Sequence, residues 1–309
     1  RVTGVQTCAL PICMDKPYFI VNPVSGSGLA AQKFKEVSKL LEAKGVDFSF
    51  DYTAAPRHAT ALAKAAIERG KRLIAAVGGD GTVNEVAAAT IGTDAVLAVL
   101  PFGTGNDFTK VMGFAKDVEG AADTILNGTV KNADAAEVNG RPFINVAGLG
   151  FDVAVLKATE KFKNKYNGML PYMLGIIDTL SHLKTMPLTI EHDGVTEKCD
   201  SIIMSVGNGQ YIGGGMRAVP MADPFDGMLD ICYVERVSIL KFICLLPKFI
   251  KGKHIKHKDI VHHIRTAEIK VSCPEACALQ LDGEVDMTTP AVFRALPGVL
   301  KVLLPADAK

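Results

Sequence analysis

The sequence lacks tryptophan, a long apolar run and any large excess of one charge. It contains no apolar stretch of the roughly 18 to 20 residues that a membrane-spanning helix needs. Because 34 Lys and Arg residues face 33 Asp and Glu residues, the net charge of +1 excludes a strongly basic nucleic-acid-binding protein. Hydrophobic residues make up 48% of the chain and charged residues 22%, which is typical of a folded protein. Its 309 residues are enough for two domains, each with its own core.

Cysteine is also sparse, and its distribution argues against a disulfide framework. Two of the seven cysteines, Cys8 and Cys13, fall in the first thirteen residues, and the others are scattered. Such an irregular set is typical of a reducing compartment, so we predict a cytoplasmic protein. Cys273 and Cys277 form a C-x3-C pair, but no second Cys or His pair stands at zinc spacing. We interpret them as ordinary thiols.

The first thirteen residues, RVTGVQTCALPIC, are unlike the rest of the chain. They resemble a translated sequencing-library adapter, and only Arg1 supplies the positive charge expected of a signal peptide. A short signal peptide is the alternative interpretation. We predict that the protein itself begins at Met14 and that residues 1–13 are not structural.

Residues 14–133 alternate between strand-like and helix-like patterns. Apolar residues at Phe34, Val37 and Leu41 have helical spacing, and Gly45 ends that segment. Continuous apolar runs indicate strands that are buried on both faces. The alternation predicts an α/β domain in which helices cover both faces of a parallel sheet. The expected strands are 18–22, 46–53, 72–77 and 95–100, and the expected helices are 30–44 and 58–69.

Residues 134–309 predict a second domain, a mostly antiparallel β-sandwich. Short strand-like runs dominate, and glycine-rich turns such as Asp193-Gly194 and Asp282-Gly283 separate them. Two helical insertions are expected at 168–185 and 238–251. The expected strands are 143–147, 188–192, 201–206, 229–234, 268–272, 278–281 and 299–304.

Three loops rich in glycine and small polar residues follow expected strands of the first domain. Residues 22–28 are NPVSGSG, residues 78–85 are GGDGTVNE and residues 101–108 are PFGTGNDF. Ligands of open α/β sheets bind at the carboxyl ends of strands, and glycine lets backbone N–H groups approach a phosphate. The second loop has three glycines around Asp80, more than a turn requires, so we predict that it binds phosphate. Asp80 would hold Mg²⁺ or order the loop.

These motifs, in this order and spacing, resemble the catalytic domain of the diacylglycerol kinase family, which sphingosine and ceramide kinases share. The resemblance is greatest to its soluble bacterial branch. It continues through Asn208-Gly209, the glycines of residues 213–215, Asp226-Gly227 and Asp282-Gly283-Glu284. It implies the NAD kinase/diacylglycerol kinase-like fold for the two domains.

The resemblance implies an ATP- and Mg²⁺-dependent lipid kinase with ATP in the cleft between its domains. Asp80 is implied to be catalytic as well as nucleotide-binding. The residues implied to bind ATP are Asn22, Pro23, Ser25, Gly26, Thr53, Gly78, Gly79, Asp80, Gly81, Thr82, Asn84 and Thr104.

A structural Mg²⁺ is also implied, with Asp226 as its ligand and Asp223 and the Met228 carbonyl as neighbours. Relatives carry two adjacent acids here, whereas this chain has Phe225 before Asp226, which leaves Asp223 as a substitute. Asp134 matches an acid that belongs to the same metal network in the family. Taken alone, the Asp-Gly pair at 226–227 is equally explained by a hairpin turn.

Glu284 matches the proposed general base of the family. A lipid hydroxyl must lose its proton as it attacks the γ-phosphate, and a positioned carboxylate can accept that proton. Diacylglycerol is the leading acceptor, with phosphatidic acid as product, and a sphingoid base or phosphatidylglycerol is the alternative. An NAD kinase-type enzyme with a soluble substrate and a non-catalytic lipid-binding protein are the two rival functions.

The implied partners are ATP and a lipid at a membrane surface. We expect no nucleic acid, and the sequence leaves a homodimer open. Residues 237–258 combine apolar side chains with clustered lysines, a pattern typical of a helix that associates peripherally with the inner face of a membrane. A core-packed helix followed by a charged loop would explain the same residues.

Overall fold

The computed structural model describes residues 16–163, 165, 166 and 170–306. The chain divides into two compact units. The first comprises the residues up to Ala133 together with those from Gly298 onward, and the second is Asp134–Pro297. Residues 1–13, interpreted from the sequence as an artefact, lie outside the described residues.

The last strand explains why the C-terminal residues belong to the first unit. β15 (Ala291–Leu304) begins in the second unit, where it pairs antiparallel with β12 (Glu268–Ser272). Further along, Lys301 and Val302 pair in parallel with β4 (Val96–Pro101) of the first unit. The prediction of one domain over 134–309 is therefore corrected, because residues 298–306 complete the first sheet. Sequence pattern joined them to the strands that precede them along the chain.

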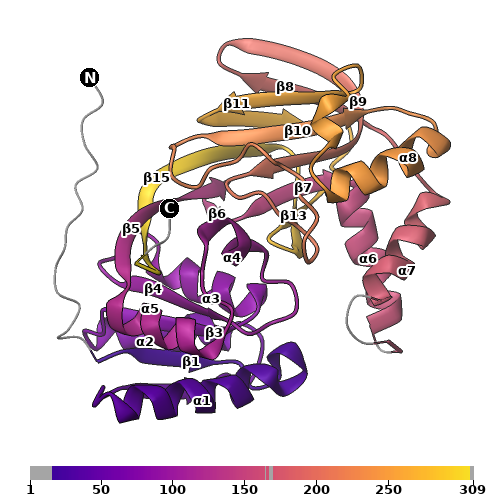
Figure 1. The fold of residues 1–309 in the computed structure, drawn as a ribbon. Helices are drawn as coiled ribbons and strands as arrows, with labels where there is room; N and C mark the ends of the chain where they lie inside the picture. Colours follow the sequence, from indigo (N-terminus) through magenta and orange to yellow (C-terminus); the bar gives the residue numbers. More distant parts are fainter. Residues whose placement is uncertain (1–15, 164, 167–169, 307–309) are drawn as a thin grey trace. The chain divides into compact units, whose positions relative to one another are not determined.

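The first unit is the predicted α/β domain with a parallel sheet (Figure 1). Its strands lie in the order β2-β1-β3-β4-β15 and pair in parallel. Every residue of β3 is buried, so helices cover both faces of the sheet, as the apolar runs predicted. The elements are β1 (Tyr18–Val21), η2 (Ser25–Gly28), α1 (Leu29–Ala43), β2 (Ser49–Tyr52), α2 (His58–Glu68), β3 (Leu73–Gly78), α3 (Asp80–Thr90), β4, α4 (Asp107–Met112) and α5 (Val118–Asn127).

The second unit is mostly antiparallel, as predicted. β9 pairs with three neighbouring strands. Its C-terminal half lies between β7 and β10, and its N-terminal half pairs with β8. The Asp193-Gly194 turn joins β8 to β9, and both residues have positive φ, as a two-residue hairpin turn requires. The strands are β5 (Thr129–Val138), β6 (Arg141–Phe143), β7 (Val146–Gly150), β8 (Met186–His192), β9 (Val195–Gly207), β10 (Leu229–Glu235), β11 (Val261–Thr266), β12, β13 (Ala278–Leu281), β14 (Glu284–Thr288) and the first part of β15.

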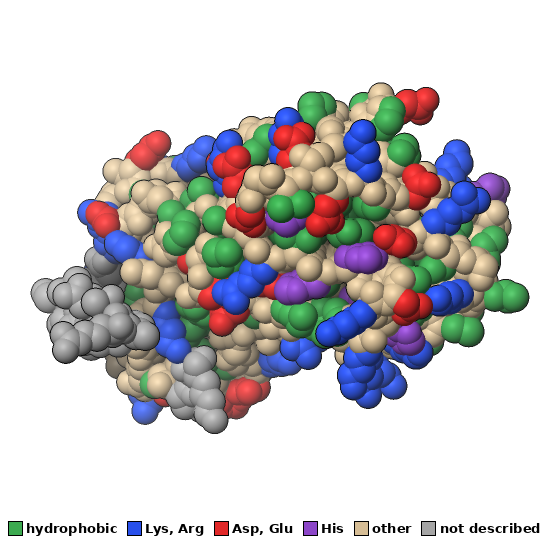
Figure 2. All heavy atoms as spheres, turned by 90° about the horizontal axis from the view of Figure 1, so that it is seen from above, with side chains coloured by type: hydrophobic (Ala, Val, Ile, Leu, Met, Phe, Trp, Pro, Cys, Tyr) green, Lys and Arg blue, Asp and Glu red, His purple; other side chains and the backbone are tan. Residues whose placement is uncertain are grey.

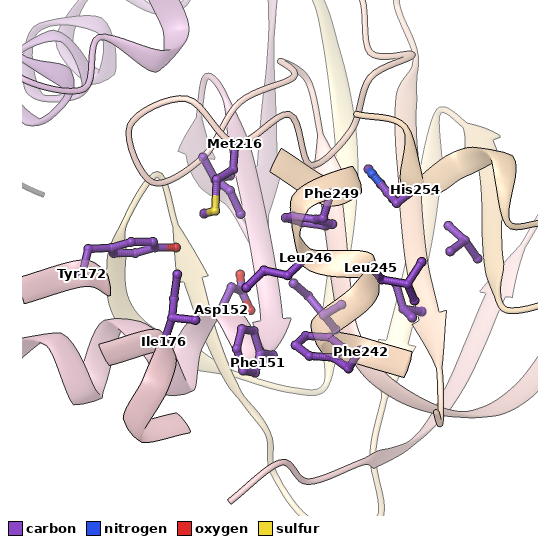
Figure 3. A pocket seen from close by; sticks show the side chains of 14 residues that line it. Phe151, Asp152, Tyr172, Ile176, Met216, Phe242, Leu245, Leu246, Phe249 and His254 are labelled. Atoms are coloured by element: carbon purple, nitrogen blue, oxygen red, sulfur yellow. The ribbon is translucent and has the colours of Figure 1, made fainter. Parts of the chain in front are cut away.

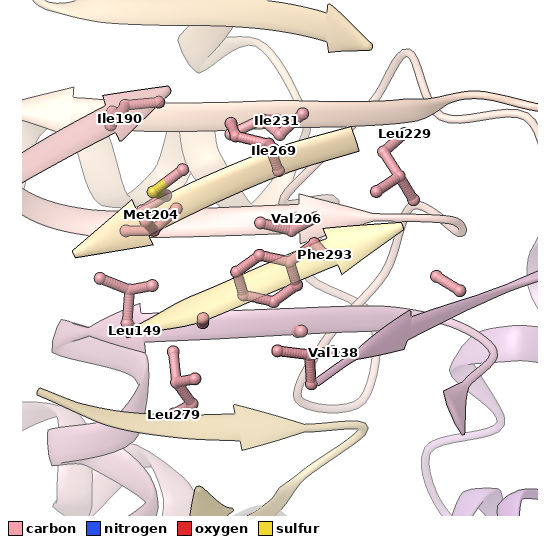
Figure 4. Packing of buried hydrophobic residues seen from close by; sticks show 14 of the residues in the cluster. Val138, Leu149, Ile190, Met204, Val206, Leu229, Ile231, Ile269, Leu279 and Phe293 are labelled. Atoms are coloured by element: carbon pink, nitrogen blue, oxygen red, sulfur yellow. The ribbon is translucent and has the colours of Figure 1, made fainter. Parts of the chain in front are cut away.

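A large hydrophobic core joins the strands of this unit (Figure 4). Phe293 of β15, Met204 of β9 and Ile231 of β10 are fully buried or nearly so in it. Alternate residues of β9 and β10 point into this core, and residues between them, such as Ile203 and Val234, are buried in a second cluster with Phe151 of α6 (Phe151–Lys163) and Phe242 of α8 (Ile239–Ile250).

Helices of the second unit lie mainly where insertions were predicted. α7 (Leu170–Leu180) and α8 (Ile239–Ile250) fall within the two expected segments, and a short η3 (His254–Lys256) follows α8. α6 (Phe151–Lys163) was not predicted. Among the described residues, no helix has both the length and the apolar character needed to cross a membrane.

One predicted strand is wrong in detail. The run 143–147 was expected to be continuous, but β6 ends at Phe143 and β7 begins at Val146. Between them the chain turns because the N–H groups of Ile144, Asn145 and Val146 donate to the carboxylate of Asp282, at 2.9 to 3.0 Å. Apolar composition alone could not reveal this distant acceptor.

Candidate active site

The three glycine-rich loops of the first unit meet backbone to backbone. A Cβ on Gly103 would lie 2.2 Å from the Cα of Gly79, so neither loop could approach the other with a larger residue there. A Cβ on Gly26 would lie 2.6 Å from the carbonyl oxygen of Phe102. The glycines thus allow the loops that follow β1, β3 and β4, placed after strands by the sequence prediction, to approach one another closely.

The first loop is held by its asparagine. Asn22 donates through Nδ2 to the hydroxyl of Thr82, at 3.1 Å, and its Oδ1 accepts from the N–H of Val24. Gly26, Ser27 and Gly28 then take positive φ values of 58°, 58° and 91° before α1 begins. Since Gly28 supplies no side-chain cap, the first N–H groups of α1 have no acceptor from that residue.

The second loop also opens a helix without a side-chain cap. Gly79 precedes α3, whose first turn carries Asp80, Gly81 and Thr82. Gly78 is packed against Thr82, because a Cβ at Gly78 would lie 2.6 Å from the threonine hydroxyl. Uncapped N-termini of α1 and α3 are suited to an anion, so these loops fit the phosphates that the resemblance implies.

Asp80 orders the third loop. Its Oδ1 accepts from the N–H of Asp107 at 2.5 Å, at the start of α4. Burial raises the pKa of Asp80 and the charge of Asp107 adds to this, although backbone N–H groups of residues 106–108 oppose the shift. Of the two roles considered for Asp80, ordering a loop has direct structural support, and its catalytic role stays a prediction.

The other predicted nucleotide residues lie around these loops with different exposure. Pro23, Ser25 and Asn84 are half-buried, and Thr104 is exposed in the third loop. Thr53 follows β2 and donates its N–H to the carbonyl of Val21 at the end of β1.

Sequence reasoning assigned no role to Glu85, the last residue of the second loop motif. Its carboxylate accepts from the N–H groups of Arg57 and Ala59, both at 2.9 Å, and so caps the start of α2. A Glu on α3 that caps another helix has no local signal, because the contact spans 26 to 28 residues.

In the second unit, Glu284 begins β14 directly after the Asp282-Gly283 turn. Its side chain is 52% exposed, and Oε2 accepts from Nη2 of Arg141 at 2.8 Å. The same guanidinium pairs with Asp286. Arg141 therefore fixes the carboxylate predicted to be the base, a partner that the motif D-G-E did not indicate.

The turn predicted to bind structural Mg²⁺ fits a cation only in part. Oδ1 of Asp226 accepts from the N–H of Met228 at 3.0 Å, and Oδ2 pairs with Arg265 at 2.8 Å. Asp223 accepts from the N–H of Phe225. Among the described residues there is no group of three or more His, Cys, Asp or Glu side chains suited to a metal. Arg265 already supplies the positive charge beside Asp226.

Asp134 and Asn208 join the segments around that turn. Oδ2 of Asp134 accepts from the N–H of Gly227 at 2.7 Å. Asn208 is fully buried and donates to the carbonyls of Asp134 and Ile144. Asp134 therefore contacts the acidic turn through a backbone N–H, and its part in a metal network stays a prediction.

An apolar pocket lies within the second unit, lined by α6, α7, α8 and neighbouring strands (Figure 3). Its empty volume is about 530 Å³, open solvent included. Phe151, Ile176, Phe242 and Leu245 contribute apolar walls. Asp152 and His254 are the lining residues with a carboxyl or imidazole side chain.

Sequence comparison matches both units to known domains. Residues 16–138 match the diacylglycerol kinase catalytic domain, and residues 145–304 match the YegS C-terminal NAD kinase beta sandwich-like domain. A diacylglycerol kinase of Bacillus subtilis (strain 168) is 32% identical over 298 residues, which cover 95% of this chain and 98% of the relative. One from Mycobacterium tuberculosis (strain ATCC 25618 / H37Rv) is 31% identical over 293 residues, covering 93% and 94%.

Solved structures agree with the sequence matches. A diacylglycerol kinase structure from Bacillus anthracis str. Sterne superposes with a TM-score of 0.75 at 25% identity, covering 96% of this chain and 98% of that one. Yeast NADH kinase, complexed with NADH, reaches a TM-score of 0.53 at 10% identity, which shows a shared fold alone. Fold and motifs together define a diacylglycerol kinase-like lipid kinase. The chain belongs to the diacylglycerol kinase catalytic-domain family.

Proposed function

We propose that the protein transfers the γ-phosphoryl group of ATP to the free hydroxyl of diacylglycerol, giving phosphatidic acid and ADP, with Mg²⁺ as the required metal. The observation that carries this proposal is the convergence of the three glycine-rich loops at one end of the parallel sheet. The relatives named diacylglycerol kinase support diacylglycerol as the acceptor.

The chain's own loops would bind the nucleotide phosphates. Backbone N–H groups at the starts of α1 and α3 lie where no side chain caps them. Gly81 leaves open space, since a Cβ there would meet no atom within 4 Å. Asn22 and Thr82 hold the two loops in register through their side-chain hydrogen bond. When bound, Mg²⁺ would neutralise phosphate charge, with Asp80 as the carboxylate of the second loop.

Glu284 is the proposed acceptor of the proton. It would take that proton from the lipid hydroxyl as the hydroxyl oxygen bonds to the γ-phosphorus and the bond from that phosphorus to ADP breaks. Arg141 holds the Glu284 carboxylate, and Asp282 fixes the preceding turn through three backbone N–H groups. These contacts reduce the motion of the base before substrate arrives.

The apolar pocket supports a lipid acceptor over a soluble one. Its aromatic and aliphatic lining would stabilise acyl chains by removing them from water, at about 0.8 kcal/mol per CH₂ group. A nucleotide-sized polar acceptor such as NAD would find few hydrogen-bonding groups there. Another lipid alcohol, such as a sphingoid base or phosphatidylglycerol, is the second candidate acceptor.

We also propose that the enzyme reaches its substrate at an anionic membrane surface. Leu240 is 78% exposed on α8, and Ile239 and Ile243 beside it are also exposed. Lys251 and Lys253 follow the helix and are exposed. Exposed apolar side chains beside lysines are suited to anionic lipid headgroups. Figure 2 shows basic, acidic and hydrophobic side chains intermingled on the face that it presents.

The test is a phosphorylation assay with γ-labelled ATP and a panel of acceptors. We expect Mg²⁺-dependent label transfer to dioctanoylglycerol, and none to NAD. Glu284→Gln should lower kcat by about 10²- to 10⁴-fold while nucleotide binding, measured by titration calorimetry, is retained. Glu275→Gln, a change at an exposed acid of the same unit, is the matched control and should leave kcat unchanged. Transfer to NAD alone, or label transfer in EDTA equal to that in Mg²⁺, would contradict the proposal.

A further inference from the structure

The acidic turn at residues 223–228, which precedes β10, has donors from the chain on both of its carboxylates. Oδ2 of Asp226 accepts from Nη2 of Arg265 at 2.8 Å, and its Oδ1 accepts from the backbone N–H two residues later at 3.0 Å. Oδ1 of Asp223 accepts from the N–H of Phe225 at 3.1 Å. Both acids are therefore engaged within the chain, and Arg265 brings a positive charge to Asp226, whose side chain is 24% exposed.

The register of β11 with β10 places Arg265 beside this turn. Arg265 lies opposite Asp230 in the antiparallel ladder, one pair from the start of β10 at Leu229. Opposite and diagonal side chains of neighbouring antiparallel strands share one face of the sheet. Oδ1 of Asp230 lies 2.5 Å from Nε2 of its diagonal neighbour, His263, so Asp230 has a partner of its own. The guanidinium of Arg265 extends past the end of β10 to Asp226.

A structural Mg²⁺ at this turn would need the oxygen that Arg265 already occupies. Mg²⁺ takes oxygen ligands at about 2.0–2.1 Å in nearly ideal octahedral geometry. A dication on Oδ2 of Asp226 would meet the guanidinium 2.8 Å from the same oxygen, and the two positive groups would repel each other. Phe225 offers no side-chain oxygen that could replace the lost ligand. Arg265 and a metal are therefore alternatives at Asp226.

We propose that the guanidinium of Arg265 takes the place of the structural Mg²⁺ expected at the acidic turn, so that an ion pair within the chain orders this turn. A guanidinium is permanently charged and presents N–H donors in a fixed plane, which suits it to hold a carboxylate where a metal would otherwise do so. The proposal goes beyond the proposed function, because it concerns how the second unit keeps its structure. It leaves the Mg²⁺ of the nucleotide as the metal that the reaction requires.

The turn held by Arg265 is also joined to β5. The N–H of Asp134 donates to the carbonyl of Pro224 at 2.7 Å, and Oδ2 of Asp134 accepts from the N–H of Gly227 at 2.7 Å. Asp134 thus binds the turn on both sides of Asp226. The ion pair with Arg265 completes a connection from β11 through the turn to β5, which is the connection that a structural metal would otherwise provide.

The first experiment counts bound metal ions without nucleotide. Mn²⁺ prefers the same oxygen ligands as Mg²⁺ and is paramagnetic, so electron paramagnetic resonance can follow its binding. Wild type and Asp226→Asn should bind equal numbers of Mn²⁺ ions. Arg265→Met, which keeps the length of the side chain but removes its charge, should bind one ion more. Arg265→Met combined with Asp226→Asn should lose that additional ion, which would locate it at the acidic turn.

The second experiment measures thermal unfolding by circular dichroism. The midpoint of wild type should be the same in EDTA and in excess Mg²⁺. Arg265→Met should unfold about 2–4 °C lower in EDTA, and Mg²⁺ should raise its midpoint again, because a ion that binds only the folded state stabilises it. Arg265→Lys retains the charge and should stay independent of Mg²⁺. Arg236→Met, at an exposed arginine of the same unit, is the matched control and should behave like wild type.

Two results would overturn the proposal. If Asp226→Asn in otherwise wild-type protein loses one Mn²⁺, a metal is bound at the turn beside Arg265. If Arg265→Met gains no ion, the guanidinium does not occupy the position of a metal. Neither measurement requires turnover, so a protein that phosphorylates no lipid would still decide the role of Arg265. Likewise, a metal found at the turn would leave the proposed phosphoryl transfer unaffected.

Discussion

Single glycines of the three loops differ in what a side chain would meet. At Gly103 an added Cβ would collide with the backbone of Gly79, at 2.2 Å from its Cα. At Gly81 it would meet nothing within 4 Å, and Gly81 lies within α3, where alanine is favoured over glycine by up to about 1 kcal/mol. The first glycine is required by the fold, and the second is available to a ligand.

We therefore expect opposite effects from two alanine substitutions. Gly103→Ala should lower stability, seen as a reduced urea midpoint in circular dichroism, because two loops must move apart. Gly81→Ala should leave that midpoint equal or higher and still lower kcat/KM for ATP at least tenfold, about 1.4 kcal/mol, since its Cβ would occupy the space proposed for phosphate. Wild-type activity in Gly81→Ala would contradict the phosphate role of this loop.

Asp152 and His254, which both line the apolar pocket, have pKa values displaced in opposite directions. Burial raises the pKa of Asp152 to about 6, with the Gln280 hydrogen bond opposing this. Burial lowers the pKa of His254 to about 4, and the charge of His257 adds to the shift. Nε2 of His254 donates to the carbonyl of Ala218, and this hydrogen bond opposes the lowering of the pKa by burial.

These shifts predict compensating effects of pH on stability. Between about pH 4 and 6, folded Asp152 holds a proton that the unfolded chain has lost, so its contribution is present at low pH and lost as pH rises through 6. For His254 the unfolded chain holds the extra proton. The stability that neutral His254 contributes is therefore present above about pH 6.5 and is lost as the pH falls towards 4. Each effect is about 3 kcal/mol, and their sum is nearly independent of pH.

Single substitutions should separate the pH-dependent contributions of Asp152 and His254 to stability. Relative to wild type, Asp152→Asn should become less stable as pH falls from 6.5 to 4, and His254→Gln should become more stable over the same interval. Urea unfolding at several pH values measures both differences. A difference from wild type that does not change with pH in either variant would show that the group's pKa is not displaced as stated.

At the scale of elements, α8 has two apolar faces with different surroundings. Phe242 and Leu245 are buried, and Leu246 and Phe249 line the pocket. Leu240 and Ile243 are exposed on another side of the helix. Core packing and an exposed apolar surface, which the sequence offered as alternatives, are therefore both present on this helix.

If α8 and the following lysines contact anionic lipid, charge reversal should weaken membrane binding. Lys251→Glu combined with Lys253→Glu should reduce binding to vesicles containing phosphatidylglycerol tenfold or more at low salt, since each lysine contributes about 1 kcal/mol. Lys35→Glu with Lys39→Glu, on exposed positions of α1, is the matched control. Activity on detergent-dispersed dioctanoylglycerol should be retained. Equal vesicle binding by wild type and the Lys251/Lys253 variant would exclude this surface.

The local sequence pattern predicted strands best where helices cover both faces of the sheet. β3 and β4 were expected within one or two residues, because their apolar runs have no other explanation. The glycine loops were also predicted to follow strands of the parallel sheet, where ligands bind. Contacts such as that of Asp282 with residues 144–146 were not predicted. They join positions 136 to 138 apart in the sequence, so they leave no local pattern.

At the scale of the whole molecule, the second unit is an insertion within the first. The chain leaves the first unit near Ala133, within β5, and returns near Gly298, within β15. The returning residues place Leu300, Val302, Leu303 and Leu304 in buried positions. At about 1.5–3 kcal/mol for each side chain, their burial is comparable to the 5–15 kcal/mol stability of a typical domain.

Removing the returning strand should therefore unfold the first unit selectively. A chain that ends at Pro297 is expected to lose protease resistance in residues 16–133 and to lose nucleotide binding. A chain that ends at Leu304 is the control and should behave like the full chain. Mass spectrometry of limited proteolysis fragments identifies which unit is cut. Equal resistance of residues 16–133 in both truncated chains would show that β15 is dispensable to the first unit.

The position of β15 at the end of the chain also delays the completion of the first sheet during protein synthesis. On the ribosome, β4 is made early but waits for β15 until the whole second unit has been translated. At ~5–20 residues per second that interval lasts roughly ten to forty seconds. Throughout it, the nascent chain carries an unpaired sheet edge, the kind of surface that invites association with other chains. The edge of β4 is therefore where a chaperone would be needed most during translation.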